Sequence, residues 1–409
     1  MRARFAACAA AAAGLVAASI LGTGAAPVSA APVQPLTARD CKVKQGQPLG
    51  DLWAQRRLAI GPFGRSSSIT SGLDVDTGRP VRVAVLDSGL FRGHPQMRGI
   101  DGPPRPQDAI NKDPGPGQYD CVGHGTQVTA IIAAQPQAGV AFAGVAPRAR
   151  ILPIKLTNSQ DVQALDIARA IDIAIADKAQ IANMSLGIPV DVPALRDAVG
   201  RAAQHHLLIV AAAGNDGQNS NLPQYPAAYS TTFSNVIAVS STDNKDQPAK
   251  TSESGNFVNI AAPGDGVQTI GVRGGYLPVT GTSFATPFVT GTAALVLAAN
   301  PGLTPAQIRA RIQATADPPP ATVPSPQYGR GIVNPYLAIT SVRDDAHTAT
   351  RSSAPAPLGL GQAPPAPDRH LRNVALGAGL GLLGLAALAI TGAAVLRGNR
   401  TRTGRAAAR

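Results

Sequence analysis

The sequence predicts an α/β fold with a mostly parallel sheet that is covered by helices on both faces. Short, almost purely apolar runs alternate with longer amphipathic segments along residues 81–315. Parallel strands are buried on both faces and need long, usually helical, connections, which produces this alternation. Of the 409 residues, 44% are hydrophobic and 15% charged, which suits one large globular domain with appendages. The expected strands are 81–86, 149–156, 181–184, 207–212, 235–240 and 257–262, and the expected helices are 51–58, 125–134, 164–178, 194–205 and 304–315.

The first 30 residues have the layout of a secretory signal peptide. Arg2 and Arg4 precede an apolar run that ends at Leu21, and small residues at 28–30 provide a cleavage site. We therefore expect cleavage after Ala30, with an uncleaved N-terminal anchor as the alternative.

Residues 31–80 are either an inhibitory propeptide or a permanent arm. Cys8 leaves with the signal peptide, so Cys41 and Cys121 are an even pair in an exported chain, and a disulfide between them is expected. Two free buried thiols are the alternative. The bond would close a loop of about 80 residues and contribute about 4 kcal/mol in the loop-entropy model. Because a covalently tied segment is hard to discard, we expect residues 31–80 to remain as an arm wrapped on the domain.

Three polar side chains lie where ligands and catalytic groups gather in parallel sheets, at strand ends and helix starts. Asp87 follows the expected strand 81–86, and Asn215 follows the expected strand 207–212. His124 lies between two glycines at the start of the expected helix 125–134, where backbone can approach closely. Each has an ordinary alternative, namely a turn-capping aspartate, a surface histidine and an asparagine turn.

Ser283 opens a segment without charge that runs to residue 300 and is expected to be a buried helix. Gly281 permits a tight turn before it, and Pro287 suits the first turn of a helix. Free backbone N–H groups and the positive end of the helix dipole would then lie beside the hydroxyl. A plain N-cap serine is the alternative.

The globular domain is expected to span residues 81–340. Its last predicted helix has Thr304 as N-cap, Pro305 at the first helical position and Gln307 at the third. Residues 328–340 are expected to form a closing strand and turn. The proline-rich stretch 341–373 has the composition of an extended linker.

Residues 374–396 are predicted to cross a membrane once. These 23 residues carry no charge and would extend about 34 Å as a helix, which spans a bilayer. A buried core helix is the alternative, but only the short tail 397–409 follows, and it holds five arginines and no acidic residue. By the positive-inside rule this tail stays in the cytoplasm and the globular domain lies outside, on the periplasmic or cell-wall side.

The expected topology explains the strongly positive net charge of the chain. The arginines of the signal peptide and of the tail account for more than half of the formal net charge of +12. No cluster of lysine and arginine interleaved with aromatic residues is present, so we expect no nucleic acid as partner.

The order Asp87, His124, Asn215, Ser283, with these flanking residues, resembles the subtilisin-like serine proteases over residues 80–340. The order also excludes an α/β-hydrolase, in which the serine comes first and sits in a G-x-S-x-G motif that Ala285 breaks. The resemblance implies a subtilisin-like three-layer fold. It also implies a serine endopeptidase in which Asp87, His124 and Ser283 are catalytic and Asn215 binds the oxyanion.

The same resemblance implies where protein or peptide substrates bind. A strand of Ser185, Leu186 and Gly187 would pair with the substrate backbone. Residues Ala212, Ala213 and Gly214 would face 225–227 across the first specificity pocket, and Asn183 is similar to a family residue near the substrate.

The sequence departs from the family's usual pattern at three positions near the catalytic residues. Phe284 and Phe288 replace a methionine and a histidine that are frequent in the serine motif, and Thr129 replaces an alanine. None is a catalytic residue, so repacking is the expected consequence. No acidic cluster has calcium-loop spacing, and we expect no metal and no cofactor.

The full layout of signal peptide, cysteine-tied arm, protease domain, linker, single span and basic tail is similar to the mycosins, the membrane-anchored subtilases of type VII secretion systems. This resemblance implies substrates exported by such a system and contact with its membrane components. Three functional hypotheses remain open. They are an endopeptidase that processes selected exported proteins, a scaffold that stabilises the secretion complex without catalysis, and a general degradative protease at the cell surface.

Overall fold

The computed structural model describes residues 46–60, 80–100, 107–110, 120–157 and 162–342. The predicted signal peptide, the membrane span 374–396, the linker, the basic tail and Cys41 lie outside these ranges, so those expectations stay predictions. The chain divides into two compact units, residues 1–350 and 351–409, and all described residues belong to the first.

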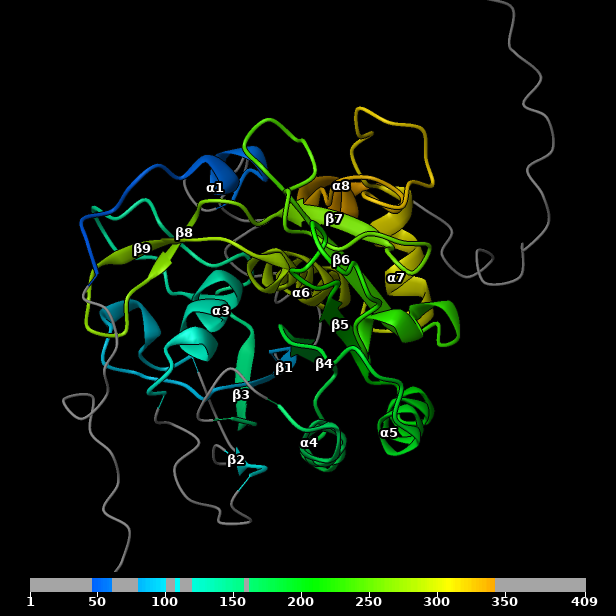
Figure 1. The fold of residues 1–409 in the computed structure, drawn as a ribbon. Helices are drawn as coiled ribbons and strands as arrows, with labels where there is room; N and C mark the ends of the chain where they lie inside the picture. Colours follow the sequence, from blue (N-terminus) through cyan, green and yellow to red (C-terminus); the bar gives the residue numbers. More distant parts are fainter. Residues whose placement is uncertain (1–45, 61–79, 101–106, 111–119, 158–161, 343–409) are drawn as a thin grey trace, which may run out of the picture. The chain divides into compact units, whose positions relative to one another are not determined.

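Seven parallel strands form the central sheet in the order β2-β3-β1-β4-β5-β6-β7 (Figure 1). They are β1 Arg82–Asp87, β2 Gln107–Asp108, β3 Arg150–Lys155, β4 Ile181–Met184, β5 Leu208–Ala212, β6 Val236–Thr242 and β7 Ile260–Pro263. From β1 the chain runs outward to the edge strand β2, returns to β3 and then crosses β1 to reach β4, so the strand order reverses at the carboxyl end of β1. The predicted α/β fold with a mostly parallel sheet is confirmed.

Helices cover both faces of this sheet. They are α1 Trp53–Arg57, α3 His124–Ala133, α4 Ala164–Ala176, α5 Pro193–Gln204, α6 Thr282–Ala299, α7 Pro305–Ala314 and α8 Pro335–Thr340, with short 3₁₀ helices at Pro95–Met97 and Ala227–Thr231. Alternate side chains of β1 enter two separate cores. Val83 and Val85 pack in the core that contains α3 and α6, whereas Ala84 and Leu86 pack in the core that contains α4 and α5.

Helix α6 is the central helix of the first core. Residues 282–297 are all buried, and the helix packs against α3 and against strands β4 to β7. It is also the one described helix whose length and composition would allow it to cross a membrane, yet 83% of it is buried inside the protein. The uncharged run after Ser283 is therefore a core helix, as predicted.

The structure corrects the sequence expectations at two places near the end of the domain. Residues 328–340 are not a strand and turn. Ile332 makes only isolated bridges to Ala261 and Asp317, and α8 follows, capped by the Asn334 side chain, which accepts from the N–H of Leu337. The antiparallel pair β8 Val267–Ile270 and β9 Tyr276–Val279 was not predicted. The capping box of Thr304 and Gln307 is present as expected.

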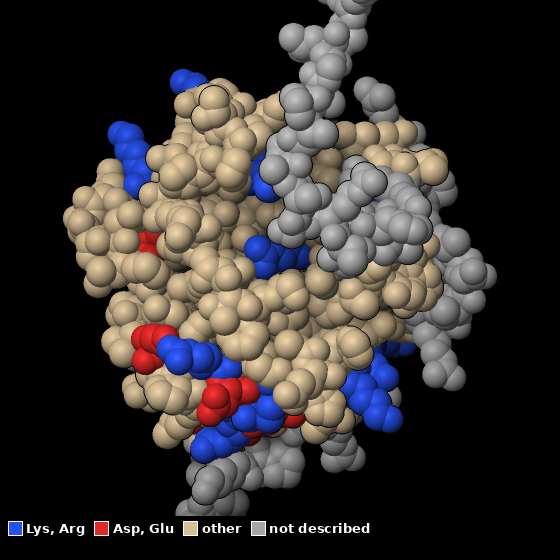
Figure 2. Space-filling model, turned by 90° about the vertical axis from the view of Figure 1, so that its right-hand side faces the viewer, with Lys and Arg blue, Asp and Glu red and all other residues tan. Residues whose placement is uncertain are grey.

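Figure 2 shows one side of the molecule, on which most of the surface is uncharged. Lysine and arginine are scattered there or lie beside acidic side chains, mainly along the lower edge. The ion pair between Arg201 of α5 and Asp172 of α4, at 2.9 Å, joins the two helices of that layer. Exposed pairs of this kind contribute little to stability.

The described part of the predicted arm, residues 46–60, packs into the protease domain. Gln47 forms an antiparallel bridge with Tyr276 of β9, with N–H···O distances of 2.8 Å in both directions. Arg57 binds the carboxylates of Asp246 at 3.0 Å and Asp317 at 2.7 Å. These contacts join residues 46–60 to the domain, and a permanent arm 31–80 stays a prediction.

Replacing Leu58 with alanine is expected to lower the free energy of unfolding by about 2–5 kcal/mol. The Leu58 side chain is 3% exposed and belongs to the main core, so its loss leaves a cavity. Chemical unfolding of the full chain in detergent measures the change. The matched control is Leu165→Ala, at a leucine that is 63% exposed, for which we expect a change of less than about 0.5 kcal/mol. If Leu58→Ala lowered the free energy of unfolding as little as Leu165→Ala does, the arm would be only loosely attached.

Candidate active site

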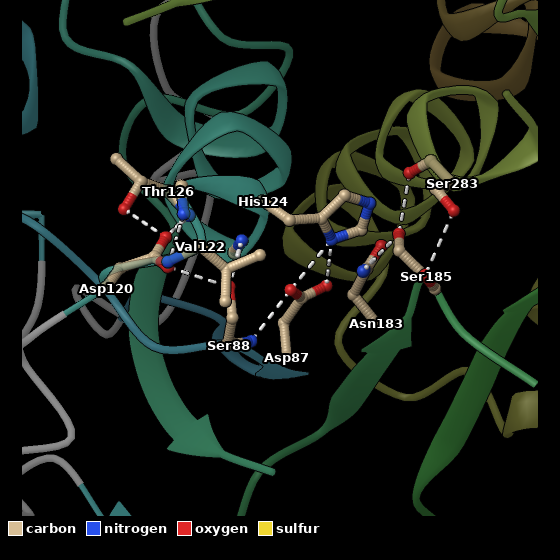
Figure 3. A network of polar contacts seen from close by, with 11 residues as sticks. Asp87, Ser88, Asp120, Val122, His124, Thr126, Asn183, Ser185 and Ser283 are labelled. Carbon is tan, nitrogen blue, oxygen red and sulfur yellow. Dashed lines mark hydrogen bonds and ion pairs between the residues drawn. The ribbon is translucent and has the colours of Figure 1, made fainter. Parts of the chain in front are cut away.

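Asp87 and His124 form a hydrogen-bonded pair at the carboxyl end of the sheet (Figure 3). Asp87 is the last residue of β1, and His124 is the first residue of α3. The Nδ1 atom of His124 lies 2.8 Å from Oδ1 and 3.0 Å from Oδ2 of Asp87. Because an ionised carboxylate only accepts hydrogen bonds, Nδ1 carries the proton and Nε2 has a free lone pair. The pairing predicted from the sequence is present.

The surroundings of His124 favour its protonated form. Burial of the imidazole lowers its pKa, but the charge of Asp87, the hydrogen bond to Asp87 and the charge of Asp120 outweigh this effect. The pKa of His124 therefore lies above the ordinary value of 6.5. An imidazole that becomes a stable imidazolium is suited to accept a proton during a reaction.

Asp120 holds the loop that presents His124, and the sequence analysis missed it. Its carboxylate is buried and accepts hydrogen bonds from Ser88 Oγ, the N–H groups of Val122, Gly123 and Thr126, and Thr126 Oγ1. Ser88 Oγ in turn accepts from the N–H of Gly125 at 2.9 Å. The loop after β1 and the first turn of α3 are thus tied together around one carboxylate. The available signal was an aspartate shortly before a helix start, the position of a capping residue.

Ser283 lies in the first turn of α6, with its side chain at the end of the same sheet (Figure 3). Its hydroxyl donates to the carbonyl of Ser185 at 3.0 Å. In the described residues no hydrogen bond joins Ser283 to His124. The centroid of the Phe284 ring, next to Ser283 in sequence, lies 5.2 Å from the centroid of the His124 imidazole. The two catalytic candidates therefore occupy neighbouring positions. A rotation about χ1 would turn the hydroxyl away from Ser185, and such loose contacts are common before substrate binds.

Pro287 explains how Ser283 is held. The sequence placed Pro287 in the first helical turn, but α6 begins at Thr282, so Pro287 lies inside the helix. Proline has no N–H to donate to the carbonyl four residues earlier, which is that of Ser283. This carbonyl accepts instead from Ser185 Oγ at 2.7 Å. The proline therefore frees the backbone of Ser283 for a contact with the sheet.

The sequence analysis placed Asn183 near the substrate, and the structure shows what its side chain contacts. It is completely buried in β4 beneath α6. Its Nδ2 donates to Ser185 Oγ at 3.0 Å, and its Oδ1 accepts from Thr290 Oγ1 at 2.8 Å. Asn183 thus positions Ser185, which in turn holds Ser283.

Asn215 follows β5 and is exposed beside the start of α6. Its Oδ1 accepts from the N–H of Thr282 at 2.8 Å and from Thr282 Oγ1 at 3.0 Å. Because the oxygen is engaged, the amide is oriented, and its Nδ2 donates to no acceptor among the described residues. The N–H of Ser283 is in the first helical turn, where N–H groups lack a partner within the helix. The amide and this N–H can both serve an anion at the positive end of α6.

The predicted substrate segments follow two neighbouring strands. β4 and β5 pair through Met184 and Ala211, and the residues after them continue beyond the sheet. Ala212 ends β5, Ala213 is buried and Gly214 follows. The segments are Ser185, Leu186 and Gly187 after β4, and Ala212, Ala213 and Gly214 at the end of β5.

Residues 185–187 belong to no strand in the described structure, which corrects the expectation of a strand there. The nearest ladder contact is an isolated antiparallel bridge between Ile188 and Tyr225, with N–H···O distances of 3.0 and 2.8 Å. No neighbouring segment among the described residues supplies the hydrogen bonds that would define a strand. Their backbone groups can therefore pair with an added peptide.

Two further predictions concern groups that could bind a metal or cross-link the chain. The described residues contain no group of three or more histidine, cysteine, aspartate or glutamate side chains that could hold a metal ion. Cys121 is disulfide-bonded. Its partner lies outside the described residues, so pairing with Cys41 stays a prediction.

Comparison with known proteins identifies the family. The model of the subtilase family matches residues 78–348. Subtilisin E of Bacillus subtilis is 36% identical over 265 residues, which are 64% of this chain and 66% of that protein. Thermitase of Thermoactinomyces vulgaris is 35% identical over 269 residues, which are 65% of this chain and 91% of that protein.

A solved structure of a mycosin matches the fold. The serine protease MycP1, an essential component of the type VII (ESX-1) secretion system, aligns with a TM-score of 0.60 and 30% identity. The alignment covers 74% of this chain and 92% of MycP1. Since the family model spans well over half of the sequence, the chain belongs to the subtilase family of serine endopeptidases.

Proposed function

We propose that this protein is a membrane-anchored, extracytoplasmic endopeptidase that uses Asp87, His124 and Ser283 to cleave proteins exported by a type VII secretion system. The observation that supports this most is the bond from His124 Nδ1 to Asp87 at 2.8 Å, beside the helical turn that carries Ser283. This arrangement gives an oriented base next to a hydroxyl that is otherwise a poor nucleophile.

In the proposed mechanism, Ser283 Oγ attacks the carbonyl carbon of the substrate peptide. Nε2 of His124 takes the hydroxyl proton and then delivers it to the leaving amine. Asp87 holds the imidazole in the required tautomer and stabilises the imidazolium. Water then repeats the sequence on the acyl-enzyme and frees Ser283. The amide of Asn215 and the N–H of Ser283 bind the oxyanion in both steps.

Replacing Asn215 with alanine is expected to lower kcat by about 10²–10³-fold with a smaller change in KM, a range measured on a subtilisin, a member of this family. The amide would be lost as a donor where negative charge develops, and substrate in its ground state makes little use of it. Steady-state kinetics on a chromogenic peptide separate the two constants.

The matched control is Asn219→Ala. Asn219 is exposed on the same loop and donates to Asp216, and we expect kcat within about twofold of wild type. A loss in Asn215→Ala that appears in KM alone would assign Asn215 to substrate binding.

The cellular part of the proposal rests on two supports. One is the structural similarity to MycP1. The other is the predicted layout, in which a cleaved signal peptide and the span 374–396 place the domain outside the membrane and the basic tail in the cytoplasm. Membrane components of the secretion system are the proposed partners, beside the protein substrates.

Comparing exported proteins in three strains tests this role. The strains carry the wild-type chain, Ser283→Ala or a deletion of the chain. We expect cleaved termini that are present only in wild type, which identifies substrates. Normal export in Ser283→Ala with blocked export in the deletion would assign a scaffold role in addition to catalysis. Cleavage of many proteins unrelated to the secretion system would replace the proposal with a general degradative protease.

A further inference from the structure

Glu253 is the only glutamate of the chain, and its carboxyl group is buried. The residue is 1% exposed. Oε1 accepts from Gln224 Nε2 and from the N–H of Asp216, both at 3.3 Å. Oε2 is buried and has no hydrogen-bond partner among the described residues. A buried carboxyl oxygen without a donor is costly, so the site has an unused capacity to accept a hydrogen bond.

The Glu253 carboxyl lies directly against the backbone of Gly214, next to the oxyanion residue Asn215. A Cβ atom built on Gly214 would lie 2.4 Å from Glu253 Cδ and 2.6 Å from Gln224 Cγ. No side chain larger than hydrogen fits there. The N–H of Glu253 also donates to the carbonyl of Gly214 at 3.0 Å.

Gln224 lies between the two segments assigned above to substrate binding. A Cβ atom built on Gly187 would lie 2.8 Å from Gln224 Cβ. Its side chain thus touches the backbone of Gly187 after β4 and of Gly214 after β5. Gln224 therefore contacts both segments, and Glu253 packs against Gly214 and accepts from Gln224.

We propose that Glu253 and Gln224 select substrates with lysine or arginine immediately before the cleaved bond. This inference rests on the protease function proposed above. A cationic side chain would donate to Oε2 of Glu253 and balance its charge. Only a long side chain with a terminal donor reaches a carboxyl that is buried against the backbone of Gly214. A small or apolar side chain leaves Oε2 unpaired, and an acidic one is repelled by Glu253 and Asp216.

Gln224 has to move aside to admit such a side chain. It is only partly buried, and its amide nitrogen, Nε2, donates to the carbonyl of Leu222 at 3.1 Å and, by a longer bond of 3.3 Å, to Glu253. After moving, its Oε1 offers a second acceptor for an arginine or lysine. Side-chain rotation of this kind is a small rearrangement compared with loop movement.

The preference is expected to depend on pH. Burial raises the pKa of Glu253 to about 7, with a further contribution from the charge of Asp216 and opposing contributions from the two hydrogen bonds to Oε1. Below this pH the carboxyl is protonated and pairs weakly with a cation. The preference for lysine and arginine should therefore grow as the pH rises through about 7. Titration of His124 affects all substrates alike and cancels in the ratio.

The test compares kcat/KM of the full chain in detergent on peptide p-nitroanilides that differ only in the residue before the cleaved bond. At pH 8 we expect lysine and arginine to exceed leucine by at least about tenfold. In Glu253→Gln this ratio should fall by at least about tenfold and lose its pH dependence. The matched control Asp197→Asn removes an exposed carboxylate on α5 and should keep the wild-type ratio.

A second variant and a labelling experiment separate a change in selectivity from a loss of folding or of catalysis. Gln224→Leu replaces a partly exposed side chain of similar size, so it should fold, and it should also lower the lysine-to-leucine ratio. Labelling of Ser283 by a fluorophosphonate reports whether the catalytic residues work. A labelled, active enzyme whose ratio is the same in wild type and Glu253→Gln overturns this inference alone. A chain that is neither labelled nor active on any peptide overturns the protease function and this inference with it.

Discussion

Replacing Ser283 with alanine is expected to lower kcat on peptide substrates by about 10⁶-fold, as measured for the equivalent change in a subtilisin, a member of this family. Without the hydroxyl, no acyl-enzyme forms, and only a slow attack by water remains. The residual rate would come from oxyanion binding and substrate positioning alone. Hydrolysis of a chromogenic peptide, measured at high enzyme concentration, gives the size of the loss.

The control for this prediction is Ser234→Ala, which removes the hydroxyl of an exposed serine before β6. We expect its kcat to stay within about twofold of wild type. Both proteins should stay folded. Ser283→Ala loses one hydrogen bond, to the carbonyl of Ser185, which is worth about 0.5–1.5 kcal/mol. A Ser283→Ala enzyme with undiminished turnover would mean that another group is the nucleophile.

Replacing Asp87 with asparagine is expected to lower kcat by about 10⁴-fold, the loss seen for the same change in another serine protease. An asparagine amide can donate to Nδ1, which stabilises the wrong tautomer and leaves Nε2 protonated. The imidazolium would also lose its main stabilising charge, since Asp87 lies 2.8 Å from Nδ1. The effect should be confined to kcat, because Asp87 is 3% exposed and does not meet substrate.

The pH dependence tests the same pair independently. His124 acts as a base only when neutral, so kcat/KM should rise with pH through its pKa, which in the wild-type enzyme lies above the ordinary 6.5. In Asp87→Asn the charge and the hydrogen bond that raise this pKa are gone, so the rise should move to lower pH. Profiles of kcat/KM between about pH 5 and 9 record both curves. An unchanged midpoint in the variant would show that His124 is not the titrating base.

The positions of the catalytic candidates could be predicted because local sequence signals locate strand ends and helix starts. Asp87 follows a continuous apolar run, and His124 stands after Gly123, whose φ of 88° is one that other residues rarely adopt. Such signals depend on neighbours in sequence. The folded sheet then brings the residues at these strand ends and helix starts to the carboxyl edge of the sheet, as it does for any parallel α/β protein.

The contacts that hold these residues could not be predicted because they join distant parts of the chain. Ser185 and Ser283 are bonded across 98 positions, and Asn183 and Thr290 across 107. A buried asparagine in a strand has the same sequence appearance whether it meets a substrate or a neighbouring helix. In the structure the Asn183 side chain contacts α6 through Thr290. The structure also shows that Pro287 leaves the carbonyl of Ser283 free to accept from Ser185, which its position in the sequence does not reveal.

Glu253 illustrates the same limit. Its sequence context of serine, threonine and glycine is typical of an exposed loop, where a glutamate is solvated. Packing against Gly214 and Gln224 buries it instead. Burial changes the chemistry of a side chain that the sequence would assign to the surface.

The most direct test of the account is to locate the nucleophile by covalent labelling. The full chain is treated with a fluorophosphonate, and the modified peptide is identified by mass spectrometry. We expect a single adduct on Ser283, formed at least about 10³-fold more slowly in His124→Ala, because the hydroxyl needs its base. A protein that hydrolyses peptides while Ser283 stays unmodified, or that labels equally fast without the imidazole, would contradict the assignment of Asp87, His124 and Ser283 as one catalytic unit.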